Sequence, residues 1–257
     1  MTASSAVLYS GGLCSHLAAQ RRIASHGTDD TILLFSDTGI EDEDLYRFVR
    51  DGVRHLGCTL VTVRAAGTFD EMIVRHQALP NNRMPFCSHE RKVEPARKWL
   101  KEHPAITTLV FGLDWTETHR LPRVQARWPS YECVAPMMEA PYLSKPQMSE
   151  AVSDSGLTPP RLYGFGFAHN NCGGGCVRNG LAAWRLLLHA MPERYETWCR
   201  REALIPGATF VRRSTGRREP ISLRELAALS CTDYDLFDIG GCGCYVDDEE
   251  DTSGEGR

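Results

Sequence analysis

The sequence lacks long hydrophobic runs and an excess of positive charge. No stretch approaches the roughly 20 consecutive apolar residues of a membrane-spanning helix. The opening MTASSAVLYS has neither the basic region nor the apolar region of a secretory signal. We therefore expect a cytoplasmic protein with no membrane partner. The formal net charge of −4 argues against a uniformly basic nucleic-acid binder.

Charge is nevertheless uneven along the chain. The segment VRRSTGRREP, residues 211–220, concentrates four arginines: Arg212, Arg213, Arg217 and Arg218. Much of the negative charge gathers in DDEEDTSGEGR, residues 247–257. The arginines fit either a local surface for nucleic acid or a solvated loop, and the composition favours the loop, with the acidic end as a disordered tail.

A disulfide framework is not expected, although the chain has ten cysteines. Without a secretory signal, cysteines serve more often as metal ligands, redox thiols or small buried side chains. Four lie in ordinary helix or strand contexts and are predicted to pack in the core: Cys58, Cys133, Cys199 and Cys231. Five lie beside glycine, proline or turn residues, where ligands are usually presented: Cys87, Cys172, Cys176, Cys242 and Cys244.

Hydrophobic periodicity predicts alternating strands and helices in the first quarter of the chain. Strands are expected at residues 6–10, 31–37 and 59–64, with helices at 11–26 and 41–57 between them. This order is typical of an α/β fold with a doubly wound, mostly parallel sheet and helices on both faces. A ligand is then expected at the carboxyl edge of the sheet.

The pattern loosens after Pro136, where helices and a glycine-rich turn replace the alternation, and no internal repeat is found. We therefore expect a nucleotide-binding α/β domain over residues 1–136. A helical lobe that contains cysteines is expected over residues 137–246, and an acidic tail over residues 247–257.

The turn after the first strand, YSGGLCS, has the features of a phosphate site. Gly11 and Gly12 permit a tight turn that leaves backbone amides free, and the hydroxyls of Ser10 and Ser15 can donate to phosphate oxygens. No Gly-Lys-Ser/Thr follows, which excludes a Walker loop. Taken alone, the turn fits an ordinary strand-to-helix connection equally well.

A second polar turn follows the next strand. In FSDTGIEDED, Asp37 and Thr38 end a strand at the same sheet edge and can reach a ribose or a phosphate. Gly39 lets the backbone turn without steric strain. The pair of motifs, SGG with a later serine and then DTG, resembles the PP-loop superfamily of adenine-nucleotide α-hydrolases. The resemblance is strongest to its phosphoadenosine phosphosulfate reductase branch.

Three further segments extend the resemblance in the family's order. CSHERKVEP, residues 87–95, is similar to the Cys-Cys-x-x-Arg-Lys-x-x-Pro segment of iron–sulfur sulfonucleotide reductases. GLDWTETHR, residues 112–120, resembles the later Gly-x-x-x-x-Glu-x-x-Arg motif, and LYGFGFAHNNCGGGC, residues 162–176, resembles the region that closes the cluster site. The chain departs from the pattern at Cys14, where the family has aspartate, and at Ser88, where it has a second cysteine.

The resemblance implies a set of site residues. A nucleotide would be bound by the two turns together with Arg91 and Lys92. Other cations suited to phosphates are His119, Arg120 and Arg123, with Glu117 to orient one of them. Cys87, Cys172 and Cys176 would hold a 4Fe–4S cluster with one open iron, with a structural zinc or plain thiols as the alternatives. The segment at His169, Asn170 and Asn171 would support the cysteine loop through hydrogen bonds.

Three functions stay open at this stage. The first is a PP-loop enzyme that uses ATP and Mg²⁺ to adenylate a nucleobase or nucleic-acid acceptor. Sulfur from a donor protein or from the cluster then displaces AMP. Arg120 and Glu117 would lie in this site, and Cys242 or Cys244 would accept sulfur. The second is reduction of a phosphosulfate nucleotide to sulfite, with Cys242 or Cys244 as nucleophile and an electron-donor protein. The third is a non-catalytic nucleotide- or nucleic-acid-binding subunit, which Cys14 favours. The sequence indicates no oligomeric state.

Overall fold

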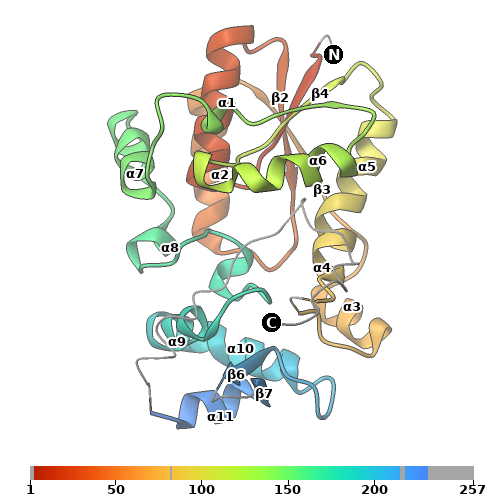
Figure 1. Ribbon diagram of the computed structural model, residues 1–257, viewed down its shortest axis with the longest axis vertical. Helices are drawn as coiled ribbons and strands as arrows, with labels where there is room; N and C mark the ends of the chain where they lie inside the picture. Colours follow the sequence, from red (N-terminus) through yellow and green to blue (C-terminus); the bar gives the residue numbers. More distant parts are fainter. Residues whose placement is uncertain (1–2, 82, 215–217, 231–257) are drawn as a thin grey trace.

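The centre of the molecule is a five-stranded parallel sheet. The computed structural model describes residues 3–81, 83–214 and 218–230. Its strand order is β3-β2-β1-β4-β5, and the strands are visible edge-on in Figure 1. Their bounds are Ser5–Leu8 (β1), Thr31–Ser36 (β2), Thr59–Val63 (β3), Thr108–Val110 (β4) and Glu132–Val134 (β5). This confirms the predicted α/β fold.

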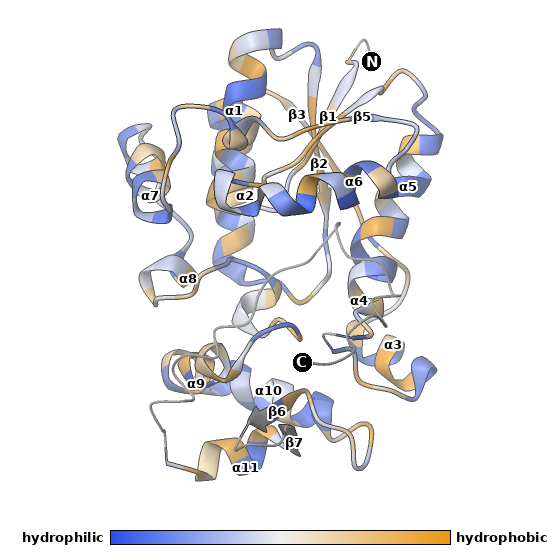
Figure 2. Ribbon diagram, viewed as in Figure 1, coloured by the Kyte–Doolittle hydropathy of each residue, from blue (hydrophilic) through white to orange (hydrophobic). Residues whose placement is uncertain are grey.

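The strands are apolar because helices cover both faces of the sheet. All residues of β1, β2 and β4 are buried, whereas the edge strand β3 is partly exposed. Figure 2 shows apolar residues running along the central strands. One face packs against helices α1, α2 and α7 (Leu13–His26, Glu43–Leu56 and Lys145–Asp154), and the other against α5 and α6 (Glu94–Lys101 and Leu121–Arg127).

A third core lies in a lobe below the sheet in Figure 1, built around the fully buried Trp184 and Trp198. Its elements are α3 (Phe69–His76), α8 (Arg161–Gly164), α9 (Leu181–Ala190), α10 (Pro192–Glu202), α11 (Leu223–Ala228) and the hairpin β6–β7 (Val211–Ser214 and Arg218–Ile221). None of the helices in the described ranges is long and apolar enough to span a membrane.

Short helical turns complete the fold. They are α4 (Phe86–Ser88), the π-helical turn η1 (His89–Val93) and three 3₁₀ turns, η2 (Trp115–Arg120), η3 (Pro136–Met138) and η4 (Cys172–Gly174). The π-helical turn is continuous with α5 and precedes Glu94. Turns of this kind are frequent at functional sites.

Packing does not follow the expected boundary at residue 136. Helix α3 precedes that residue, yet Phe69 and Met72 belong to the core of the lobe. Helix α7 follows it, yet Met148 and Val152 pack on the sheet with α1. The division of the chain into domains at residue 136 stays a prediction. The acidic tail at 247–257 lies outside the described residues.

The arginine-rich segment is a hairpin rather than the expected loop. Strands β6 and β7 pair antiparallel, with Arg212 opposite Pro220 and Arg213 opposite Glu219. Arg217 lies outside the described residues. The hairpin joins the core of the lobe through Val211 and Ile221, which are both buried.

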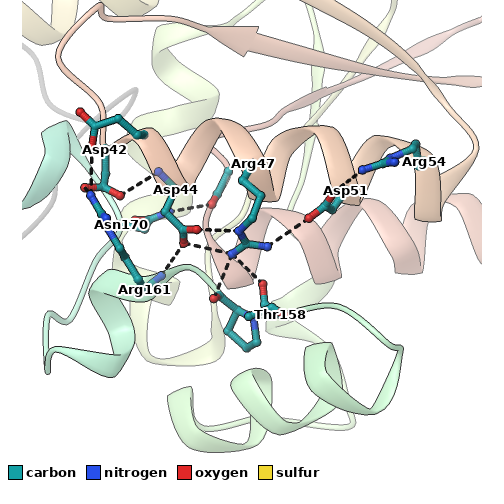
Figure 3. A network of polar contacts seen from close by, with 11 residues as sticks. Asp42, Asp44, Arg47, Asp51, Arg54, Thr158, Arg161 and Asn170 are labelled. Atoms are coloured by element: carbon teal, nitrogen blue, oxygen red, sulfur yellow. Dashed lines mark hydrogen bonds and ion pairs between the residues drawn. The ribbon is translucent and has the colours of Figure 1, made fainter.

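A polar network joins the start of α2 to the lobe (Figure 3). Asp42 caps α2 by accepting a hydrogen bond from the Asp44 amide at 2.9 Å, and its other oxygen accepts one from Arg161 at 2.8 Å. The Arg161 amide donates to Asp44 at 2.7 Å. Arg47 donates to the Thr158 carbonyl at 3.1 Å. These contacts fix the segment that enters α8 against the first turn of α2.

Gly112, at the end of β4, allows α1 to begin against the sheet. A Cβ at residue 112 would lie 2.7 Å from both the amide nitrogen and the Cα of Ser15. We predict that Gly112→Ala lowers the free energy of unfolding by about 1–3 kcal/mol, because backbone cannot move aside as a side-chain end can. Urea denaturation measures the change.

Gly164→Ala is the matched control, since a Cβ there meets nothing within 4 Å. Equal midpoints for the two variants would contradict the proposed packing constraint.

Candidate functional site

The turn between β1 and α1 presents backbone amides at the sheet edge. Gly11 has φ +72°, and a Cβ there would lie 2.9 Å from Val49 Cγ2. Helix α1 has no side-chain N-cap. The Leu13 amide donates to the Tyr163 hydroxyl at 3.3 Å, which ties this turn to α8. An uncapped helix start with positive-φ glycine before it is suited to anions.

The two predicted serines face each other across the turn. The Ser10 hydroxyl donates to Ser15 Oγ at 3.1 Å, and Ser15 Oγ donates to the Gly12 carbonyl at 3.0 Å. Asn170 donates from Nδ2 to the Gly11 carbonyl at 3.0 Å. The segment at 169–171 therefore supports the glycine turn directly, in addition to leading into the cysteine loop.

These residues line a pocket that we call the loop pocket. Its lining comes from the glycine turn, the end of β4, η1, η2, the start of α7 and the segment after α8. The polar and charged members are Ser10, Ser15, Lys92, Glu117, Arg120, Lys145, Tyr163, His169, Asn170 and Asn171. The fold thus brings together five sequence-predicted side chains separated by up to 110 residues: Ser10, Ser15, Lys92, Glu117 and Arg120.

The second polar turn has its own hydrogen bonds. Asp37 accepts from the Gly39 amide and the Tyr46 hydroxyl, each at 2.8 Å, and from Arg64 Nε at 3.1 Å. Burial raises the pKa of Asp37, but these hydrogen bonds, led by that from Arg64, outweigh it and leave the pKa below its usual value. The Thr38 hydroxyl donates to Glu41 at 2.8 Å.

Arg91 and Lys92 occupy successive positions of η1 but have different surroundings. Arg91 donates to the Thr38 carbonyl at 2.8 Å and to the Gly67 carbonyl at 3.0 Å, so it holds two turns in place. It does not line the loop pocket. Lys92 is 6% exposed and lines both the loop pocket and a second, adjoining pocket.

The second pocket, which we call the thiol pocket, contains the three cysteines that the resemblance singles out. Cys87 comes from α4, and Cys172 and Cys176 come from the glycine-rich loop after α8. Cys172 has φ +52°, and its amide donates to Glu41 Oε2 at 2.5 Å. A hydrogen bond with Cys176 and burial raise the pKa of the Cys172 thiol well above its ordinary value, against the lowering effect of Lys92.

The donor set of the thiol pocket fits a soft metal centre. Iron–sulfur clusters and zinc prefer cysteine sulfur as a ligand, and the side chains of three cysteines share this pocket. Within the ranges that the structure describes, no three His, Cys, Asp or Glu side chains converge closely enough for a single metal ion. A zinc ion needs all its sulfur ligands at about 2.3 Å from one point.

Two ion pairs border the loop pocket on the η2 side. Glu117 accepts hydrogen bonds from Arg120 and from the Asp114 amide, the latter at 3.3 Å. Asp114 is paired with Lys145 at 2.9 Å. Lys145 was not expected from the sequence, because no local motif marks it. Asp114, Glu41 and Tyr163 belong to motifs that carry the resemblance, but no role was expected for them.

Cys14 occupies the position where the family has aspartate, and it also lines the loop pocket. Burial raises the pKa of the Cys14 thiol to about 12, with Lys145 opposing the shift. The thiol is therefore neutral near pH 7, and the negative charge that an aspartate would place there is absent. The remaining predicted cysteines, Cys242 and Cys244, lie outside the described residues.

The charge on Asp37 generates a pH prediction. Because the folded-state pKa is lowered, Asp37 stabilises the fold fully above the unfolded pKa of 3.8, and that stabilisation is lost as the pH falls through the folded value. We predict that Asp37→Asn lowers the free energy of unfolding by about 1–3 kcal/mol at pH 7. The difference from the unsubstituted protein should shrink below pH 4 in urea denaturation.

Asp154→Asn, at the exposed end of α7, is the control and should show no such convergence. A difference for Asp37→Asn that stays constant from pH 7 to pH 3 would contradict the ionised carboxylate.

Comparison with known proteins identifies a family model, a relative and a solved structure that resemble this chain. Residues 4–123 match the model of the phosphoadenosine phosphosulfate reductase domain. A Methanocaldococcus jannaschii protein of uncharacterized function is 29% identical over 97 residues, which is 38% of this chain and 20% of that protein. This chain thus matches about a fifth of the relative's length.

A crystal structure of phosphoadenylyl-sulfate reductase from Candida auris, in complex with phosphate, superposes with a TM-score of 0.48 and 18% identity. The superposition covers 65% of this chain and 79% of that one. Residues 4–123, which contain both polar turns and η1, are thus similar to the phosphoadenosine phosphosulfate reductase domain.

Proposed function

We propose that the protein binds ATP with Mg²⁺ in the loop pocket, adenylates an oxygen of a nucleobase acceptor, and replaces that oxygen by sulfur delivered from the thiol pocket. One observation carries the proposal: Lys92 lines both pockets, so a phosphate site and three thiols adjoin each other. A nucleotide-activating reaction and a sulfur-delivering reaction can therefore take place in one site.

The loop pocket supplies what adenylation requires. The amides at the start of α1 and the Ser10 and Ser15 hydroxyls suit the leaving pyrophosphate, and Lys92 suits the α-phosphate because its side chain is buried beside the turn. The acceptor oxygen attacks the α-phosphorus, the bond to the bridging oxygen of the β-phosphate breaks, and pyrophosphate leaves. Mg²⁺ would be held chiefly by the phosphates, since Asp114 and Glu117 are already paired.

The second half-reaction uses the thiol pocket. A sulfide-level sulfur attacks the activated carbon, the carbon–oxygen bond breaks, AMP leaves with the oxygen, and the proton of the sulfur goes to solvent. Cys87, Cys172 and Cys176 would hold a 4Fe–4S cluster, which supplies nucleophilic sulfur when bound. Glu41 holds the Cys172 amide and so positions the loop that carries two of these thiols.

Reduction of a phosphosulfate nucleotide is the second candidate, and the family match over residues 4–123 favours it. In that reaction a thiolate attacks the sulfate sulfur and the nucleoside phosphate leaves. The nucleophile would be Cys242 or Cys244, and an electron-donor protein would release sulfite. The same loop pocket would bind the phosphates of this nucleotide.

Nucleotide preference separates the two candidates. By calorimetry on anaerobically purified protein, we expect ATP with Mg²⁺ to bind more tightly than the phosphosulfate nucleotide, and the reverse order would favour reduction. Lys92→Met should weaken ATP binding by about 10- to 100-fold, because a charge-assisted hydrogen bond is lost.

Lys98→Met, on the exposed face of α5, is the matched control and should bind ATP normally. Unchanged ATP binding by Lys92→Met would remove Lys92 from the site, and binding without turnover of either nucleotide by the unsubstituted protein would favour a non-catalytic subunit.

Cys172→Ser tests the cluster. We expect this variant to lose its iron and its visible absorbance when it is purified without oxygen, because a hydroxyl is a poor ligand for a soft centre. Iron-to-protein ratio and absorbance are the measurements. Cys199→Ser is the control, since Cys199 is buried in the lobe and does not line the thiol pocket. Iron retained by Cys172→Ser would contradict Cys172 as a ligand, and zinc in place of iron in the unsubstituted protein would contradict the cluster.

A further inference from the structure

Two aromatic side chains are exposed together beside the loop pocket. Trp115 is 43% exposed and Tyr142 is 59% exposed. Their ring centroids are 6.0 Å apart, with an interplanar angle of 54°. The Trp115 indole donates from Nε1 to the Leu143 carbonyl at 3.2 Å, so the ring is held in one orientation although its face is open to solvent.

The pair belongs to the two segments that border the loop pocket. Trp115 is the first residue of η2, whose Glu117 and Arg120 line that pocket. Tyr142 lies three residues before Lys145, which lines it as well. Asp114, which directly precedes Trp115, forms an ion pair with Lys145, which follows Tyr142 by three residues. This ion pair joins the two segments. The aromatic pair is thereby placed at the border of the pocket.

Side chains that can contact phosphates continue from this border along one stretch of chain. His119 and Arg123 are exposed, and Arg120 lies between them. Exposed aromatic rings beside side chains that can contact phosphates are the arrangement with which proteins hold single-stranded nucleic acid, because bases stack on the rings and the backbone contacts those side chains.

We propose that Trp115 and Tyr142 form a platform for a single-stranded nucleic acid, in which a base stacks on the Trp115 ring and contacts the tilted Tyr142 ring with its edge, placing the neighbouring acceptor base at the loop pocket. The inference rests on the proposed function, because it names the class of acceptor. Stacking of one base strengthens binding by about 5- to 150-fold, which alone gives a dissociation constant no tighter than several millimolar. A free nucleoside would therefore not be retained on so exposed a pair, whereas a strand adds contacts to His119 and Arg123.

Tryptophan fluorescence reports on this platform. Of the five tryptophans, Trp128, Trp184 and Trp198 are buried, and Trp99 is half-buried and stacked on His103. Titration with a mixed-sequence single-stranded RNA oligonucleotide should quench the fluorescence of Trp115. Trp115→Ala should lose the quenching and bind the oligonucleotide about 5- to 150-fold more weakly, and Tyr142→Ala should bind more weakly while it still fluoresces.

Phe165→Ala is the matched control, because Phe165 is 42% exposed, directly follows α8 and lines a different pocket, together with Glu43 and Arg194. It should bind the oligonucleotide as the unsubstituted protein does. Equal affinity of Trp115→Ala and Phe165→Ala would overturn the platform. Quenching of equal strength by a nucleoside monophosphate, or by a duplex of the same sequence, would overturn the single strand as its ligand.

Calorimetry with ATP separates this inference from the proposed function. Trp115→Ala should bind ATP with Mg²⁺ normally, since Trp115 does not line the loop pocket. ATP binding without oligonucleotide quenching would overturn the platform and leave the proposed function standing. Trp115-dependent quenching without ATP binding would overturn the proposed function and leave the platform as a binding site.

Discussion

The approach of helix α1 to the end of strand β4 is the constraint on which the site depends. Gly112 has no side chain, so the Ser15 backbone can lie against it. This places the uncapped start of α1 at the carboxyl edge of the sheet, beside η1 and η2. A larger residue at 112 would push the amides at the start of α1 away from Lys92 and Arg120, and the loop pocket would lose its shape.

The lobe contributes residues to the loop pocket at the edge of the sheet. Tyr163 and Asn170 reach back to the glycine turn, while Arg161 is held by Asp42 and Asp44 at the start of α2. The same segment then enters the cysteine loop. Because one stretch of about fifteen residues contacts both pockets, the positions of the backbone amides at the start of α1 and of the thiols are mechanically linked. Lys92, one of four lysines in the chain, lies where the two pockets meet.

Sequence patterns predicted the strongly periodic elements and missed the short ones. The runs at β1, β2 and β3 and the helices between them were found because buried strands and amphipathic helices have distinct periods. Strand β5 and the hairpin β6–β7 were not expected, because their three or four residues per strand include charged side chains such as Glu132, Arg212 and Glu219, in place of the apolar run of the equally short β1. Helix α7 was expected as a helix, but its packing on the sheet was not, since its sequence does not reveal which core receives Met148 and Val152.

The sequence by itself determined the fold class, the two polar turns at the sheet edge and the cysteines suited to soft metals, because each depends on residues close together in the chain. Tertiary structure alone decided which of the predicted residues share a pocket. It placed Arg91 against backbone carbonyls and Lys92 between two pockets, although the two are adjacent in sequence. It also brought Lys145 and Tyr163 to the glycine turn, more than 120 residues away. Such proximity comes from the packing of whole helices on a sheet, which no local pattern records.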